Sequence, residues 1–370
     1  MFEITQARPA LFPVTRSTPH PSEDSMDLEF GIDTFGDRTA DADGELETHA
    51  AGVRHVVDLG VTAEQAGLNA FNVGEHHRDD YTVSAPEMVL AAIAARTQRI
   101  RLGTAVTVLS SDDPVRVHER FATLDALSSG RAEAVLGRGS FTESFPLFGY
   151  SLHDYEDLFE EKLELFAQLR TQQPLTWSGR HTQDLDDVTL YPPLEGGEPL
   201  RTWVAVGGSP QSVVRAARHD LPLMLAIIGG PSSRFAPFAQ LYRDAREKFG
   251  HEGESRVGFH MIGHVAETDH AAFQQFAQPY LSHHARLGAE RGWPRMTPQA
   301  LRGELDHGLM AVGSPETVAR KVARGIQDLG ASRVSFKVQH GPIAHEHNRR
   351  SVELFGEKVV PLVKDMLAGS

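Results

Sequence analysis

Short apolar segments that are typical of β-strands alternate with amphipathic segments that are typical of α-helices along most of the chain. This alternation favours parallel βαβ units. The eight predicted strands cover residues 28–33, 70–73, 100–109, 132–136, 202–206, 221–228, 257–265 and 334–338. Eight strand–helix repeats predict an α/β fold of the TIM (β/α)8 barrel type with insertions, and a doubly wound open sheet is the competing architecture.

Three segments depart from this repeat. Residues 172–200 contain Pro and Trp and are too long for a simple helix–strand loop, so they predict a small hairpin. Residues 269–309 are expected to be helical, with an interruption at Gly292-Trp293-Pro294. Residues 1–26 are rich in Pro, Ser and Thr and predict an irregular extension. The barrel is therefore expected to form one domain over residues 27–370.

Several predicted helices carry start signals. The sequence Ser84-Ala85-Pro86-Glu87 has the pattern of a capping box, which predicts Ser84 as the N-cap. Gly208-Ser209-Pro210 and Gly313-Ser314-Pro315 both predict a Ser N-cap followed by Pro in the first helical turn.

Charge and cysteine content limit the classes of function. The formal net charge of −14 at pH 7 disfavours binding to nucleic acid or to an anionic membrane, because phosphate groups are repelled. The chain has no cysteine, which excludes disulfides, thiolate metal sites and a Cys nucleophile. The N-terminal residues show no apolar segment of a signal peptide, so the cytoplasm is the expected location.

One of the two Gly-Ser-Pro turns is a candidate phosphate site. A helix N-terminus offers free N–H groups, and Gly207 and Gly208 let the backbone approach an anion closely. Arg138, at the end of a neighbouring strand, can add charged donors. Glu316 in the second turn would repel phosphate, whereas the turn at Ser209 has no acid. The alternative is that both serines are ordinary N-caps.

The sequence Glu75-His76-His77 follows the second predicted strand, where the active site of such a barrel lies. A catalytic role, a metal-binding role and a structural role are all open from the residues alone. Adjacent side chains of an extended segment point to opposite faces, and no His-x-His follows the first strand, which disfavours a metal-dependent hydrolase. The histidines at 260, 264, 283 and 284 have no clear partner.

Several of these segments together resemble bacterial luciferase-like flavin monooxygenases. The similar segments, in order, are 74–77, 100–116 (IRLGTAVTVLSSDDPVR), 124–131 (LDALSSGR), 136–140 (LGRGS), 207–213 (GGSPQSV) and 312–319 (VGSPETVA). The resemblance covers roughly residues 27–365. One departure is Gly137, which stands where the luciferase catalytic subunit has a reactive Cys, so luminescence is not expected.

The resemblance implies a TIM barrel that binds FMN, often as a dimer, and no metal. It implies that His76 is the catalytic histidine, with Glu75 and His77 beside it. It also implies that the peptide bond between Ala105 and Val106 is cis and lies against the isoalloxazine ring. The cofactor-binding residues expected on this basis are Thr104, Ala105, Val106, Arg138, Gly139, Ser140, Gly207, Gly208 and Ser209.

The reaction implied is oxygenation of a small organic substrate by O2. Reduced FMN would capture O2 as a C4a-(hydro)peroxide, which His76 would stabilise or protonate in a dry pocket. No G-x-G-x-x-G fingerprint follows a predicted strand, so we expect a separate NAD(P)H:flavin reductase to supply reduced FMN. The alternatives are an F420-dependent oxidoreductase, a non-catalytic flavin-binding protein and, least favoured, a metal-dependent hydrolase.

Overall fold

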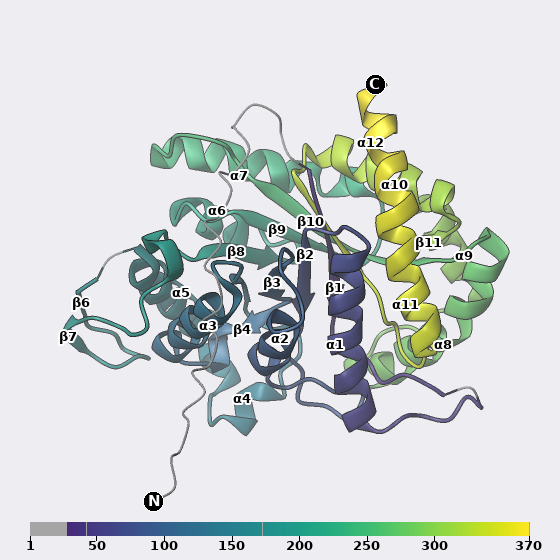
Figure 1. Ribbon diagram of the computed structural model, residues 1–370. Helices are drawn as coiled ribbons and strands as arrows, with labels where there is room; N and C mark the ends of the chain where they lie inside the picture. Colours follow the sequence, from purple (N-terminus) through teal and green to yellow (C-terminus); the bar gives the residue numbers. More distant parts are fainter. Residues whose placement is uncertain (1–27, 42, 172, 370) are drawn as a thin grey trace, which may run out of the picture.

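The computed structural model describes residues 28–41, 43–171 and 173–369. Within them, parallel strands form a closed barrel surrounded by helices (Figure 1). The barrel strands are β1 (Glu29–Thr34), β2 (Ala70–Val73), β3 (Arg101–Thr104), β4 (Thr107–Val108), β5 (Glu133–Gly137), β8 (Arg201–Val206), β9 (Leu223–Ile227), β10 (Val257–Val265) and β12 (Arg333–Lys337). The order around the barrel is β3-β2-β1-β12-β10-β9-β8-β5-β4.

The barrel closes because β3 and β4 are two parts of one strand. β4 pairs with β5 through Thr107 and Val108, and a parallel bridge joins Leu102 of β3 to Ala132 just before β5. The described strands therefore occupy eight positions around the barrel, which confirms the closed barrel over the open sheet.

Amphipathic helices cover the outside of the barrel (Figure 1). Helix α10 illustrates why: Val318, Val322, Ile326 and Leu329 recur at helical spacing and are buried. The main helices are α1 (His49–Gln65), α2 (Pro86–Ala94), α3 (Pro114–Ser128), α5 (Tyr155–Thr171), α6 (Pro210–Arg218), α7 (Ala236–Phe249), α8 (Asp269–Arg291), α9 (Pro298–His307), α10 (Pro315–Leu329), α11 (His345–Leu354) and α12 (Val360–Ala368). A short helix α4 (Ser144–Leu147) follows β5, and a π-helical segment, Phe355–Val359, joins α11 to α12.

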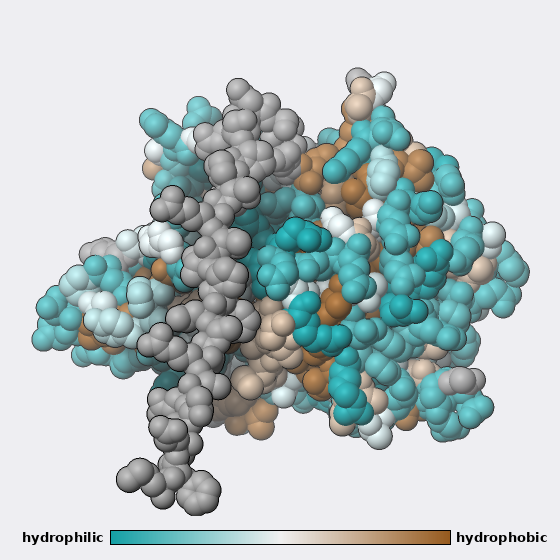
Figure 2. Space-filling model, in the orientation of Figure 1, coloured by the Kyte–Doolittle hydropathy of each residue, from teal (hydrophilic) through white to brown (hydrophobic). Residues whose placement is uncertain are grey.

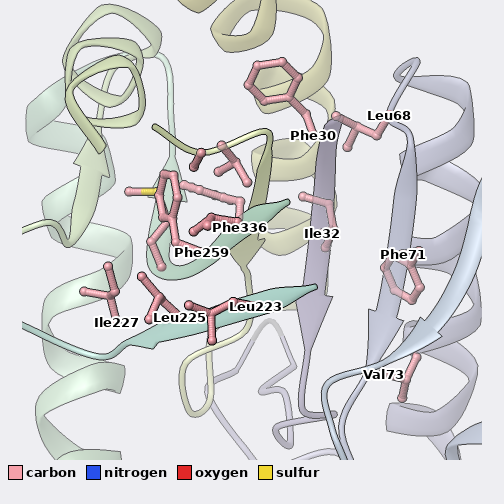
Figure 3. Close-up of a cluster of buried hydrophobic side chains, with 14 of the residues drawn as sticks. Phe30, Ile32, Leu68, Phe71, Val73, Leu223, Leu225, Ile227, Phe259 and Phe336 are labelled. Carbon is pink, nitrogen blue, oxygen red and sulfur yellow. The ribbon is translucent and has the colours of Figure 1, made fainter. Parts of the chain in front are cut away.

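Alternation along each strand separates an apolar outer core from a polar interior. Phe30 and Ile32 of β1, with Phe71 of β2 and Phe336 of β12, belong to the outer core of buried side chains (Figure 3). Burying each such side chain contributes about 1.5–3 kcal/mol. The face of the molecule seen in Figure 2 is mostly hydrophilic, with smaller hydrophobic patches between the polar side chains.

Charged residues fill the end of the barrel where the strands begin. Five strands start with a charged residue, namely Glu29, Arg101, Glu133, Arg201 and Arg333. Arg333 donates to Glu133 over 2.8 Å, and both side chains are fully buried. Burial disfavours ionisation of Glu133, but the arginines around it, Arg333 above all, hold its pKa down at about 2. This network closes the barrel at the end opposite the predicted active site.

The insertions agree with expectation in part. Residues 172–200 contain the predicted hairpin, β6 (Leu175–Trp177) and β7 (Leu185–Val188), which projects at the left of Figure 1. The second insertion forms α8 and α9, separated by the predicted interruption at 292–294. The short strand β11 (Ala311–Gly313), which pairs with the end of β10, was not predicted, because three residues carry no periodicity.

The predicted cap of α2 is wrong. The structure places Ala85, not Ser84, at the N-cap, and no side chain caps this helix. Pro86 at the first helical position fixes the start one residue later, and it lacks an N–H group that would need a cap. The extension predicted over residues 1–26 lies outside the described residues. In the described part of the chain, no helix is both long enough and apolar enough to cross a bilayer.

Candidate active site

A cavity of about 500 Å³ opens at the carboxyl ends of the barrel strands. All eight strand positions contribute lining residues, from Asp33 of β1 to Lys337 of β12. The predicted residues Glu75, His76, His77, Thr104, Ala105, Val106, Arg138, Gly139, Ser140 and Gly207 all line this cavity. Gly208 and Ser209 follow Gly207 directly but are not among the lining residues. The fold therefore brings nearly all of the predicted site residues into one space.

Helix α6 begins at the edge of this cavity. Ser209 is its N-cap, because its Oγ accepts from the N–H of Ser212 at 3.4 Å and donates to Gln211 at 3.0 Å. A Cβ atom at Gly207 would meet nothing within 4 Å, so the backbone here is open to a ligand. The hydroxyl of Ser209 is occupied by the cap, which leaves backbone N–H groups as the available donors.

The second Gly-Ser-Pro turn has the same cap but a different environment. Ser314 caps α10 by accepting from Thr317. The carboxylate of Asp269 already accepts the N–H of Ser314 at 2.7 Å, and Ser314 does not line the cavity. Both serines are thus N-caps, and only the turn at Ser209 adjoins the cavity.

Arg138 lies at the same end of the cavity as α6. Its guanidinium pairs with Glu156 of α5 and lies 5.3 Å from the centre of the Tyr155 ring. The Tyr155 hydroxyl donates to the carbonyl oxygen of Gly139 at 2.7 Å, which fixes the loop after β5. Arg215 of α6 also approaches Glu156, at 3.4 Å. Sequence reasoning missed Arg215, although it lies three residues after Ser212 on the same helix face.

The break between β3 and β4 forms one wall. The peptide bond between Ala105 and Val106 is cis, as the resemblance implied. Thr104 lines the cavity, but its hydroxyl donates to the carbonyl of Val135 at 3.2 Å and accepts from Thr107 at 3.0 Å. A Cβ at position 137 would lie 2.6 Å from Cγ2 of Val106, so Gly137 is required by this packing.

Glu75 connects His77 to the wall. One carboxylate oxygen lies 2.9 Å from Nε2 of His77, and the other accepts the N–H of Val108 at 3.2 Å. Both carboxylate oxygens of Glu75 therefore have partners. The arrangement positions β4 relative to the loop after β2.

His76 sits among aromatic rings. Its ring stacks on Tyr81 with centroids 4.1 Å apart, and Phe141 approaches edge-on at 4.6 Å. Its buried Nδ1 has no hydrogen-bond partner among the described residues. Burial, together with the positive charge of Lys337, lowers the pKa of His76 to about 3. His76 is therefore a neutral imidazole at neutral pH. It can donate or accept a hydrogen bond, but it does not carry a positive charge.

The wall of the cavity opposite β3 and β4 carries polar residues that sequence analysis did not identify as part of a site. His260 of β10 donates from Nδ1 to Asp33 of β1 over 2.7 Å. Lys337 of β12 lies 3.1 Å from Asp37, and burial lowers the pKa of Lys337 although Asp37 acts in the opposite direction. Their positions in the sequence could have identified them. Asp33 and Lys337 lie at or near the carboxyl ends of strands, at positions whose side chains alternate with the outward-facing apolar ones and therefore point into the barrel.

Helix α8 covers the cavity. Tyr280, His283, Leu287 and Arg291 of this helix line it. Ion pairs tie the helix to the loop after β2: Glu290 lies 2.6 Å from Arg78, and Arg286 lies 2.8 Å from Asp80. The ion pairs thus hold α8 in place along the cavity.

The described residues hold no cluster of three or more His, Asp or Glu side chains with the arrangement of a metal site. Glu75 and His77, which adjoin His76, interact with each other instead.

Comparison with known proteins agrees with this geometry. The sequence model of the luciferase-like monooxygenase family matches residues 29–333. The 4-hydroxyprotoasukamycin monooxygenase of Streptomyces nodosus subsp. asukaensis is 28% identical over 333 residues, which are 85% of this chain and 87% of that protein. The alkanal monooxygenase alpha chain of Photobacterium leiognathi is 24% identical over 343 residues, 86% of this chain and 96% of that one.

The fold comparison gives the same answer. The crystal structure of monooxygenase RslO1 from Streptomyces bottropensis superposes with a TM-score of 0.77 at 25% identity, covering 90% of this chain and 99% of that one. The family match extends over most of the barrel, including every predicted site residue. The chain is therefore an enzyme that belongs to the luciferase-like monooxygenase family.

Proposed function

We propose that this enzyme is an FMN-dependent monooxygenase that transfers one oxygen atom of O2 to a small organic substrate. The observation that carries the proposal is the extent of the cavity, which reaches from Arg138 and Gly207 to Ala105 and Val106. A phosphate at one end and a flat ring at the other require such a continuous space. A volume of about 500 Å³ lies in the range of cofactor pockets.

The residues present fit FMN. Arg138 and the N–H groups at the start of α6 would hold the phosphate, since helix N-termini favour anions. The isoalloxazine ring would lie along Ala105 and Val106, where the wall has small or β-branched side chains. When bound, reduced FMN would supply the electrons and the carbon atom that reacts with O2.

The protein supplies position, hydrogen bonds and a dry space. His76, being neutral, would give or accept a hydrogen bond at the reacting end of the cavity without adding charge. Glu75 and His77 would keep the wall at β4 in place. Helix α8 would keep water away from the reacting end of the cavity. These three tasks are the ones a flavin oxygenation leaves to the protein.

The names of the relatives support the same assignment. The relatives compared above are named monooxygenases, one of 4-hydroxyprotoasukamycin and one of alkanals. We propose that a separate NAD(P)H:flavin reductase delivers reduced FMN, because no dinucleotide fingerprint follows a strand. We also propose a homodimer on the strength of the family likeness, which light scattering of the purified protein would test.

The deciding experiment is cofactor binding followed by an oxygen pulse. FMN and F420 are titrated into the purified protein, and the FMN complex is reduced without oxygen and mixed with O2 in a stopped-flow instrument. Tight FMN binding and slow reoxidation through a distinct absorbing species are expected. Binding of F420 but not FMN would overturn the cofactor assignment. Rapid oxidation of NADH by the purified protein alone would overturn the separate reductase.

A further inference from the structure

Asp33 and His260 form a hydrogen-bonded pair in the wall of the cavity. Nδ1 of His260 lies 2.7 Å from Oδ2 of Asp33, and only 3% and 7% of the surfaces of Asp33 and His260 are exposed. Because a carboxylate oxygen accepts, the hydrogen atom shared by the pair resides on Nδ1 of His260. In the Nδ1–H tautomer, Nε2 of His260 carries a free electron pair, and no hydrogen bond to Nε2 is seen among the described residues. A base nitrogen is thus left without a protein partner in the cavity wall.

Asp33 is held firmly in this position. Its second oxygen accepts from Nδ2 of Asn72 at 2.6 Å, and Oδ1 of Asn72 faces Arg333 at 3.4 Å. A Cβ at position 103 would lie 2.5 Å from Oδ1 of Asn72, so Gly103 leaves the space that this network needs. The pair is therefore anchored to the charged layer that closes the barrel, and His260 is oriented through it.

The pair lies across the cavity from the proposed flavin. Three strands separate β10 from the β3–β4 position in each direction around the barrel. They are β2, β1 and β12 on one side and β5, β8 and β9 on the other. His260 of β10 is thus opposite Ala105 and Val106, while Arg138 and α6 follow β5 and β8. The substrate must occupy the space between the flavin ring and this wall.

Other residues that line the cavity indicate the kind of substrate. Tyr81, Phe141, Tyr280, Leu287, Trp293 and Met224 line the cavity. This surface favours an aromatic or otherwise flat apolar molecule. A neutral imidazole forms a stable anion by complete proton removal only from a fairly acidic hydroxyl, such as that of a phenol or an enol, because proton transfer depends on how close the two pKa values are. The buried ammonium of Lys337, which also lines the cavity, would favour the resulting anion.

We propose that the substrate is a phenol or an enol and that His260, oriented by Asp33, is its general base. In this step the O–H bond of the substrate breaks and an N–H bond forms at Nε2. The electron pair stays on the substrate oxygen, which becomes anionic, and Asp33 faces the imidazolium that results. The added electron density prepares the substrate carbon for oxygen transfer. This proposal rests on the proposed function and names its substrate class.

The competing explanation is that the pair only holds the barrel together. Loss of the pair would then lower stability without changing the ionisation of a bound phenol. A probe that reports ionisation separates the two explanations. 4-Nitrophenol is suitable, because its anion is yellow and its neutral form is not.

The first experiment measures difference absorbance of 4-nitrophenol with the full chain, with and without FMN, at a pH where the free probe is mostly neutral. The wild type is expected to bind it as the anion. His260→Gln should bind it in the neutral form, and Asp33→Asn should give an intermediate anion fraction. His345→Gln is the matched control, because His345 pairs with Asp58 at 2.9 Å but does not line the cavity. Melting curves confirm that each variant is folded.

Two outcomes would overturn the proposal. One is an undiminished anion signal in His260→Gln. The other is no anion signal in the wild type, whether the probe stays unbound or binds in its neutral form. Because the readout does not require flavin, failure of FMN to bind would overturn the proposed function and leave this result standing.

The second experiment tests the positioning role of Asp33. ¹⁵N spectra of histidine-labelled protein should show His260 as the Nδ1–H tautomer in the wild type and as a mixture in Asp33→Asn. With reduced FMN, O2 and a phenol that the wild type hydroxylates, His260→Gln should lower kcat by about 10²–10⁴-fold with a smaller change in KM. A single unchanged tautomer in Asp33→Asn would remove Asp33 from the assignment.

Discussion

Arg138 and Glu156 form an ion pair at the end of the cavity where α6 begins. The Arg138 side chain is one-quarter exposed and that of Glu156 more than half exposed, so solvent screens the pair. Glu156 also lies 3.4 Å from Arg215. A phosphate that binds here would meet a guanidinium already oriented, but it would compete with the carboxylate of Glu156.

Replacing Arg138 with Ala should weaken FMN binding by about 1.5–3 kcal/mol, because a charge-assisted hydrogen bond to the phosphate is lost. Titration of the flavin fluorescence measures the change. Arg116→Ala serves as control, since Arg116 is an exposed residue of α3 that pairs with Glu119 and does not line the cavity. Equal affinity of Arg138→Ala and the wild type would contradict the phosphate assignment.

Replacing Glu156 with Gln should have the opposite effect. Removal of the competing carboxylate frees Arg138, while Arg215 keeps its ion pair with Glu160, so FMN affinity should rise by up to about 1 kcal/mol, the range of exposed ion pairs. The gain should shrink at high salt, because screening weakens the same interactions. Glu119→Gln is the matched control on α3. Weaker binding by Glu156→Gln would show instead that Glu156 is needed to orient Arg138.

Gly137→Ala should weaken FMN binding through the wall at β4. The new Cβ would lie 2.6 Å from Cγ2 of Val106, so Val106 must move. Overpacking of this kind costs about 1–3 kcal/mol, and displacement of Val106 alters the surface proposed to contact the ring. Gly303→Ala in α9 is the control, because its Cβ would meet nothing within 4 Å. Full FMN affinity in Gly137→Ala would argue against the ring position.

The barrel was predictable because its signals are local. Each strand is apolar over a few residues, and helices such as α10 show their buried stripe at a fixed spacing. The two secondary-structure features that were not predicted correctly are also local. β11 is too short to show a pattern, and the capping-box pattern at Ser84 could not reveal that Pro86 sets the start of α2.

The site was predictable where its residues are contiguous. Glu75, His76 and His77 form one short segment, and the turn at Ser209 is another. The pair of Asp33 and His260 joins residues 227 positions apart and exists only because the barrel closes. The ion pair of Arg138 with Glu156 likewise depends on where the fold places α5 relative to the loop after β5. Such partners cannot be inferred from spacing along the chain.

We predict that the buried side chain of His264 makes the fold less stable in mild acid. It is fully buried in β10, and burial lowers its pKa to about 4, although the hydrogen bond that its Nε2–H donates to Oε1 of Gln275 at 2.8 Å acts in the opposite direction. The unfolded chain therefore takes up a proton on this residue at a higher pH than the folded chain does. The contribution of neutral His264 to the free energy of unfolding is complete above pH 6.5. It is lost as the pH falls toward 4, by up to about 1.4 kcal/mol per pH unit.

Urea unfolding between pH 7.5 and 4.5 measures this dependence. His264→Gln should be less stable than the wild type at pH 7.5, because the imidazole packing is lost, but its free energy of unfolding should fall less steeply below pH 6.5. His76, whose pKa is lowered in the same direction by burial, continues to contribute to the slope in both proteins. The difference in slope should approach one proton per molecule, because only position 264 differs. Parallel curves for the two proteins would show that His264 binds its proton equally in the folded and unfolded states, against the effect of its burial.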